Sequence, residues 1–197
     1  MQGSSVNTSR PTLGLLITAA GGAERIREKF VQPAIEAGWS VAIVASPTAA
    51  TWLDNLGEVR RLEAATGYEV RIQPRMPGES SPHPPIDVYA VVPASANTVA
   101  KLALGLADNQ LLTTACEVIG GQVVPVVVFP RVNAAHARQP MWDQHLVALR
   151  KVGVHLVYGD DVWPLHEPRQ APPGKDLPWP AILQTVNDAY VNRPDPS

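Results

Sequence analysis

Short apolar runs alternate with helical patterns along almost the whole chain. Uncharged apolar runs of about four to eight residues are typical of buried strands, whereas apolar residues at i, i+3, i+4 and i+7 indicate one face of a helix. The expected strands cover residues 13–18, 41–45, 68–72, 88–92, 123–129 and 154–158. The expected helices cover residues 24–37, 59–65, 97–104, 139–150 and 181–191, with further helical segments around Trp52 and Cys116. This alternation predicts an α/β fold, a Rossmann-like three-layer sandwich with a mostly parallel sheet between helices.

Two proline-rich stretches interrupt this pattern and are expected to be loops. They cover residues 74–85 and 159–180. Residues 1–10 are polar and lack the apolar core of a signal peptide, so a disordered tail is expected there. The remaining residues, 11–197, are then expected to form a single domain, a size that allows a substantial core.

Composition and charge exclude several classes of protein. A net charge of -2 creates no field that would gather nucleic acid. The lone Cys116 excludes an internal disulfide and a multi-cysteine metal site, which favours a reducing cytoplasm. No uncharged apolar run of about 18 residues is present, so no membrane span is expected. His136 and His145 lack a third ligand at helical spacing, and no metal site is expected.

Candidate chemistry is concentrated where the strand at 88–92 passes into a helix. Pro93 is expected to end the sheet ladder because it has no N–H to donate, and Asn97 or Thr98 is expected to cap the helix. The small residues at 94–98 leave room for a ligand at the carboxyl end of a strand, where open α/β sheets bind their ligands. From the residues alone, the ordinary explanation is a tight loop with a good helix cap.

The run Pro93-Ala94-Ser95-Ala96-Asn97-Thr98 is identical to a signature of the homo-oligomeric flavin-containing cysteine decarboxylases. This family includes phosphopantothenoylcysteine decarboxylase and the enzymes that oxidatively decarboxylate the C-terminal cysteine of lantibiotic precursor peptides. The chain resembles the family from roughly Leu13 to Tyr158. The resemblance implies that Ala94, Ser95, Ala96, Asn97 and Thr98 lie against flavin mononucleotide (FMN). It also implies that Asn97 faces the carboxylate of the substrate.

Two further segments extend the resemblance toward the cofactor. Ser46-Pro47-Thr48-Ala49 matches the family's Ser/Thr-Pro-x-Ala pattern, which makes Ser46 and Thr48 candidates to hold the FMN phosphate. The alternative is that they only cap the helix that carries Trp52. In the turn after the first expected strand, Ala19 and Ala20 occupy the place of the family's Gly-Ser pair, which contacts FMN, so a hydroxyl is missing there. The dinucleotide fingerprint GxGxxG is absent from this turn.

The segment Pro130-Arg131-Val132-Asn133 is similar to the family's Pro-x-Met-Asn pattern. The resemblance implies that Asn133 helps to place the substrate, although Val132 replaces the methionine. The Gly105 to Leu112 segment also resembles a family stretch, and Asp108 or Asn109 is expected to cap the next helix.

The chain departs from the family at its acid–base residue and at its flap. The family's catalytic histidine stands eight residues ahead of an aspartate; Asp87 matches that aspartate, but Glu79 stands at the histidine position. His83 is the nearest histidine and is the candidate for a general base or a carboxylate partner. The family's flap cysteine has no counterpart, because Cys116 is the lone thiol and is expected to be buried and inert. This absence argues against the step in coenzyme A biosynthesis.

The leading hypothesis is an FMN-binding flavoprotein that oxidatively decarboxylates a cysteine-containing substrate, with Asn97, Asn133 and His83 as catalytic residues. The second is a flavin-binding or regulatory protein that keeps the pocket and has lost the base. A third, a prenyl-transferring flavoprotein, is less favoured because no basic residues match a prenyl phosphate site. The resemblance also implies a homo-oligomer, a trimer or a dodecamer of trimers, with FMN at the subunit contacts.

Overall fold

The computed structural model describes residues 10–172 and 174–193. The expected disordered tail therefore lies outside the described residues, except for Arg10. Within the described part of the chain, no helix combines the length and the apolar character needed to cross a membrane. No three His, Cys, Asp or Glu residues in that part are grouped so as to hold a metal ion.

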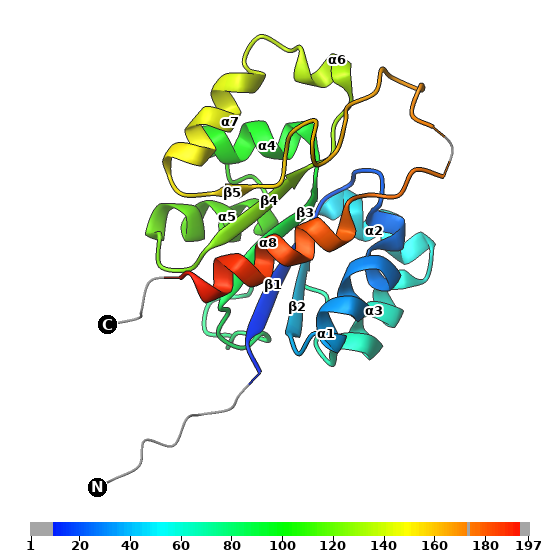
Figure 1. The fold of residues 1–197 in the computed structure, drawn as a ribbon. Coiled ribbons are helices and arrows are strands. Elements are labelled where there is room, and N and C mark those ends of the chain that lie inside the picture. Colours follow the sequence, from blue (N-terminus) through cyan, green and yellow to red (C-terminus); the bar gives the residue numbers. More distant parts are fainter. Residues whose placement is uncertain (1–9, 173, 194–197) are drawn as a thin grey trace, which may run out of the picture.

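The strands form one parallel sheet with the order β2-β1-β3-β4-β5. Their bounds are Thr12–Ile17 for β1, Ser40–Ala45 for β2, Val88–Ala94 for β3, Val126–Pro130 for β4 and His155–Leu156 for β5. Helices cover both faces of this sheet (Figure 1). The predicted Rossmann-like three-layer sandwich is therefore confirmed, and every strand pairing in it is parallel.

Two groups of helices make up the outer layers. One face is covered by η1 (Ala23–Arg25), η2 (Arg27–Val31), α1 (Gln32–Glu36), α2 (Pro47–Asn55), α3 (Glu58–Thr66) and α8 (Trp179–Val191). The other face is covered by α4 (Ala96–Leu104), α5 (Gln110–Gly121) and α7 (Trp142–Lys151), and the short α6 (Ala134–Ala137) follows β4. Figure 1 shows α8 lying across the sheet in front of β1 and β3.

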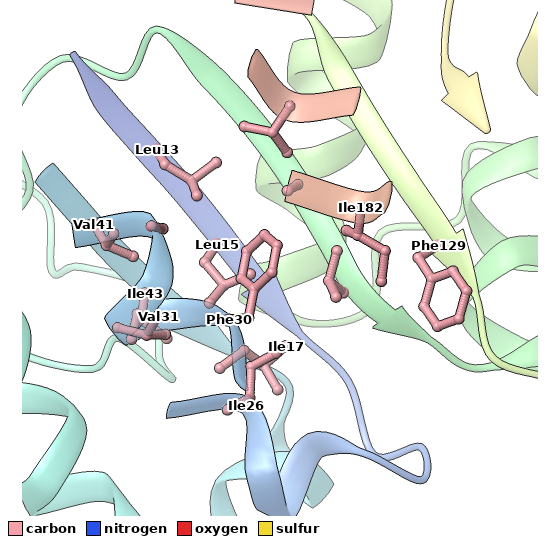
Figure 2. Packing of buried hydrophobic residues seen from close by; sticks show 14 of the residues in the cluster. Leu13, Leu15, Ile17, Ile26, Phe30, Val31, Val41, Ile43, Phe129 and Ile182 are labelled. Atoms are coloured by element: carbon pink, nitrogen blue, oxygen red, sulfur yellow. The ribbon is translucent and has the colours of Figure 1, made fainter. Parts of the chain in front are cut away.

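Strand β1, which lies between β2 and β3, supplies both cores by alternation along its length. Leu13, Leu15 and Ile17 point into the core under α8 and η2, and Leu16 points into the opposite core. Figure 2 shows Leu13, Leu15 and Phe30 packed together on the first side. Both faces of the sheet are covered, so the strands consist of nearly continuous apolar residues. Such runs are why the strands could be predicted from the sequence.

The first predicted helix, over residues 24–37, is helical but not uniformly α-helical. It passes from the 3₁₀ turn η1 through the π-helical turn η2 into α1. Pro33 lies in α1 and has no N–H to donate to the preceding turn. The wider π turn before it, in which the Gln32 N–H donates to the Arg27 carbonyl, accommodates that missing donor.

One of the predicted strands does not form, and two others are shorter than expected. The prediction of a strand at 68–72 is wrong, because Arg71 alone pairs with Val44 there as an isolated bridge. Beyond that bridge the chain runs toward Pro74 and the proline-rich loop, which cannot continue a ladder. The strand predicted at 123–129 begins only at Val126, and the one at 154–158 is reduced to β5.

The prediction that Pro93 ends the ladder is also wrong, because β3 continues through Pro93 to Ala94. The pairing with β4 shifts register between Val91 and Ala94, and Ala94 pairs with Pro130 beyond the shift. The missing N–H of Pro93 falls in this irregularity, where a ladder donor is not needed. The strand consequently delivers Ser95 to the edge of the sheet.

Candidate functional site

The order of the strands places a crevice at the carboxyl edge of the sheet. From β1 the chain moves to β2 on one side and then crosses to β3 on the other side of β1. The point where the strand order reverses lies between β1 and β3, and open α/β sheets bind ligands at such a point. A cavity of about 540 Å³ opens here, within the usual range for a small-molecule site.

This edge cavity is lined by residues that follow three strands. They come from the turn after β1, the start of α2, the start and second turn of α4, and the loop into α5: Thr18, Ala19, Ser46, Pro47, Thr48, Ser95, Asn97, Thr98, Lys101, Asp108, Asn109, Leu111 and Leu112. Segments separated by up to about ninety residues in the sequence thus meet at one place because parallel strands share a carboxyl edge.

The amino ends of α2, α4 and α5 border the edge cavity. Ser46 caps α2 through its hydroxyl, which accepts from the Ala49 N–H at 3.3 Å. Asn109 caps α5 in the same way, with its side-chain oxygen 3.1 Å from the Leu112 nitrogen. The partial positive charge of helix amino ends and their free N–H groups suit a phosphate or another anion.

Ser95, and not Asn97 or Thr98, caps α4. Its hydroxyl accepts from the Thr98 N–H at 3.2 Å and pairs with the Thr98 hydroxyl at 2.9 Å. The predicted cap was therefore wrong by two or three residues. As a result Asn97 is free of a capping role, is exposed, and lines the cavity one residue into the helix.

Thr18 fixes the hinge between β3 and α4. Its buried hydroxyl donates to the Pro93 carbonyl at 2.8 Å and accepts from the Ser95 N–H at 2.9 Å. A hydroxyl is thus present in the first turn, one residue before Ala19. It holds the backbone of the neighbouring strand and so fixes the shape of the cavity floor.

Lys101 and Asp108 form an ion pair at the rim of the cavity. The hydrogen bond from Lys101 holds the pKa of the Asp108 carboxyl below its ordinary value, and the Lys101 charge acts in the same direction. The pair leaves the rim close to neutral, so the positive character of the cavity comes from the helix amino ends.

Most, but not all, of the sequence-predicted cofactor residues meet in this cavity. Ala19, Ser46, Thr48, Ser95, Asn97 and Thr98 line it. Ala20 and Ala94 are buried beside it, and Ala96 packs against the core under α4. These three are therefore structural neighbours of the lining residues.

The other two catalytic candidates lie elsewhere in the chain. Asn133 caps α6, accepting from the His136 N–H at 2.9 Å, and lines a separate pocket of about 180 Å³. His83 lies on the proline-rich loop, with its Nε2 2.8 Å from the Glu69 carbonyl oxygen. Glu79 binds the Met76 N–H at 2.9 Å within the same loop. Neither His83 nor Asn133 reaches the edge cavity of the same chain.

Sequence reasoning missed Thr18, Lys101 and the two leucines of α5 as lining residues. One signal for Lys101 was its spacing, since Asn97 and Lys101 are i and i+4 on one helix and must share a face. Cys116 was expected to be buried but is only half-buried, and this burial raises the pKa of its thiol.

A parallel α/β sheet with a cavity at its reversal point, bordered by helix amino ends, is typical of proteins that bind a phosphorylated small molecule at the carboxyl edge of the sheet. Comparison with known proteins gives the particular family. The Flavoprotein family profile matches residues 2–190, and the chain belongs to that family.

Individual relatives agree with this membership. A probable phosphopantothenoylcysteine decarboxylase of Arabidopsis thaliana is 38% identical over 71 residues, which are 36% of this chain and 34% of that protein. The match thus spans only about a third of that relative's length. The FMN-dependent cysteine decarboxylase TvaF of thioviridamide biosynthesis superimposes with a TM-score of 0.66 at 19% identity, covering 93% of this chain and 100% of TvaF. The FMN-binding protein AtHal3 has a TM-score of 0.66 at 21% identity, with 95% and 100% covered. These two likenesses show the fold.

Proposed function

We propose that this chain is an FMN-binding flavoprotein that oxidatively decarboxylates a cysteine-containing substrate, such as the C-terminal cysteine of a peptide. The observation that carries the proposal is the edge cavity, where the Ser46 turn and the Ser95–Thr98 hinge meet across β1. Relatives whose names record cysteine decarboxylation and FMN binding support it.

The cavity has the size and the donors that FMN requires. The amino ends of α2 and α4, together with the Ser46 and Thr48 hydroxyls, would hold the phosphate. Small side chains at Ala19 and Ser95 leave the floor open to a flat ring. Bound FMN would supply the redox chemistry by accepting two electrons from the substrate thiol, after which the resulting thioaldehyde loses its carboxylate as carbon dioxide.

The protein's contribution is positioning and electrostatics. The Asn97 side chain, exposed at the first turn of α4, would donate an N–H to the substrate carboxylate and orient it before cleavage. Its exposure in the single chain fits a site that a second subunit covers. We therefore propose a homo-oligomer, a trimer or a dodecamer of trimers, located in the cytoplasm. Light scattering of the purified protein tests the oligomeric state.

The function is tested by the visible spectrum of the purified protein. A yellow flavin that bleaches without oxygen when a peptide ending in cysteine is added supports the decarboxylase, and a matched peptide ending in serine serves as the control. The product peptide should lose the mass of carbon dioxide and two hydrogens. A yellow protein that is inert to the cysteine peptide supports the alternative, a flavin-binding or regulatory protein. A colourless protein that refuses added FMN overturns both.

A further inference from the structure

A second, smaller pocket lies beside the turn that follows β1. It has a volume of about 180 Å³ and is lined by residues after β4 and by the loop that follows β5, residues 159–172. This loop crosses over the carboxyl edge of the sheet (Figure 1). It is attached to the start of α6, where the Ala134 N–H donates to the His166 carbonyl at 2.9 Å. The pocket is therefore built between two anchored segments.

Arg131 is half-buried and lines this pocket, and its guanidinium is incompletely satisfied. Its Nε is buried and has no hydrogen-bond partner among the described residues. Its Cζ lies 5.5 Å from the centre of the Trp163 ring. No carboxylate of the described chain lies within ion-pair distance of it. Burial lowers the pKa of Arg131, and the charge of Glu24, which lies beyond ion-pair distance, offsets part of this effect.

The other charges around the pocket do not supply that counter-ion. Glu167 is held by Arg138 through two hydrogen bonds of 2.6 and 2.9 Å, so its charge is already paired. Lys175 adds a second cation 4.3 Å from the centre of the Trp163 ring, and its Nζ lies 2.9 Å from His166 Nε2. Arg131 and Lys175 thus place two cations against the Trp163 ring.

A buried donor on a permanent cation is costly unless an acceptor satisfies it. The backbone of Arg131 is fixed, because its N–H donates to the Ala94 carbonyl at 2.8 Å beside the hinge. The guanidinium also lies against the first turn, with Nη2 3.6 Å from the place of a β-carbon at Gly21. Ala19, two residues earlier, lines the edge cavity, so the two hollows adjoin the same turn.

We propose that Arg131 binds an acidic group, a carboxylate or a phosphate, of the ligand that enters the edge cavity. The pocket is too small for a whole cofactor and has room for one such group and a few further atoms. A guanidinium binds both groups through two parallel N–H donors. Asn133 lines the same pocket and adds an amide donor. The inference rests on the proposed function in one respect, which is that the ligand is a thiol substrate with an acidic group.

The test follows the arginine Nε–H resonances of ¹⁵N-labelled holoprotein by NMR during titration at constant ionic strength. One titration adds inorganic phosphate and the other adds N-acetylcysteine, a thiol carboxylate. The Arg131 resonance should shift and saturate with at least one probe, and the probe that saturates identifies the acidic group. Failure of both probes to give saturable binding overturns the proposal.

Variants make the assignment specific to this side chain. Arg131→Gln should weaken the saturating probe at least tenfold, and Arg131→Lys, which keeps the charge but loses the paired donors, should weaken it less. Arg60→Gln removes the same charge from an exposed position on α3 and should leave binding within twofold. Equal binding by the Arg131→Gln and Arg60→Gln proteins also overturns the proposal. If Arg131→Gln fails to fold, the titrations of the wild type and of Arg131→Lys still test whether Arg131 binds the probe.

The flavin content of each sample is read separately from its visible spectrum. A colourless protein that still binds a probe through Arg131 would refute the flavin assignment and leave the acidic-group site standing. A yellow protein that decarboxylates the cysteine peptide but shows no saturable shift at Arg131 would refute the acidic-group site and leave the flavin assignment standing.

Discussion

Thr18 and Ser95 are joined by a hydrogen bond of 2.9 Å from the Ser95 N–H to the Thr18 hydroxyl. The same hydroxyl donates to the Pro93 carbonyl at 2.8 Å, so one side chain satisfies both sides of the hinge. Thr18 is almost fully buried. The geometry of the edge cavity therefore depends on a residue that touches both β1 and β3.

Replacing Thr18 by Val should destabilise the protein. The change keeps the shape of the side chain but leaves a buried carbonyl and a buried N–H without partners, at a cost of about 2 kcal/mol. Urea unfolding followed by circular dichroism measures this loss. Thr51→Val, which removes an exposed hydroxyl that donates to the Pro47 carbonyl, is the control and should change stability by less than about 0.5 kcal/mol. Equal losses for the two variants would mean that the Thr18 bridge does not hold the hinge.

Asn97→Asp should weaken FMN retention or turnover. The substitution keeps the size of the side chain but places a negative charge beside the ring site and the expected substrate carboxylate. A tenfold change in the FMN dissociation constant, or in the rate of peptide decarboxylation, corresponds to about 1.4 kcal/mol. Fluorescence titration with FMN measures the first quantity. Asn55→Asp, exposed at the end of α2, is the control. Unchanged retention and turnover in Asn97→Asp would remove the hinge from the site.

His83→Asn should leave FMN affinity within twofold of the wild-type value. His83 contacts the Glu69 carbonyl on the proline-rich loop and does not line the edge cavity of its own chain. The measurement is the same FMN titration, with decarboxylation of the cysteine peptide recorded beside it. A large loss of decarboxylation with unchanged FMN affinity would place His83 at the site of a neighbouring subunit. A loss of FMN affinity would contradict the location described here.

The hinge and the Ser46 turn could be predicted from the sequence because their chemistry is local. Small residues directly after an apolar strand predict a ligand-accessible turn wherever the strand lies in the sheet. Thr18 could not be assigned in this way, since its role depends on β3 pairing beside β1, a contact between residues more than seventy positions apart. Local pattern does not reveal which strand becomes the neighbour.

The failures at Pro93 and at residues 68–72 have the same origin. A missing N–H was expected to end β3, but a register shift against β4 makes that donor unnecessary. Residues 68–72 have the composition of a strand, yet only Arg71 finds a partner, at the outer edge of β2. Strand length is decided by the partner strand, which the sequence of one segment does not contain.

Glu58 should make stability depend on pH. Its side chain is only 10% exposed and pairs with Arg27 at 2.7 Å and with Arg61 at 2.8 Å. Burial alone would raise the pKa of the Glu58 carboxyl, but the hydrogen bonds and charges of the two arginines outweigh it and hold the pKa below its ordinary value. A carboxyl with a lowered pKa in the folded state stabilises that state above its ordinary pKa. The stabilisation is lost as the pH falls through the lowered value.

Glu58→Gln should accordingly be less stable than the wild type at neutral pH and should approach it in stability at acidic pH. The free energy of unfolding, measured in urea across the pH range, checks this expectation. Glu69→Gln, at an exposed position after α3, should run parallel to the wild type at every pH. A Glu58→Gln difference that is constant with pH would show that the carboxylate charge contributes nothing.

Leu177, in the loop just before α8, packs closely on the turn after β1. Gly22 permits this contact because it has no side chain. A β-carbon at Gly22 would lie 2.3 Å from Leu177 Cδ1, and the residue has a φ of +104°. Gly22→Ala therefore combines backbone strain with a steric clash and should cost more than about 2 kcal/mol. Gly38→Ala is a matched control, because Gly38 has a φ of +97° with nothing within 4 Å of its β-carbon position.

The excess cost of Gly22→Ala over Gly38→Ala then measures the clash with Leu177. Adding Leu177→Ala should recover that excess while leaving the backbone strain, so the two substitutions should be strongly coupled in a double-mutant cycle. Urea unfolding of the four proteins in the cycle and of the Gly38→Ala control gives the values. Additive effects would mean that the loop does not lie on this turn in solution, and Arg131 would then lose the wall of its pocket that Trp163 provides.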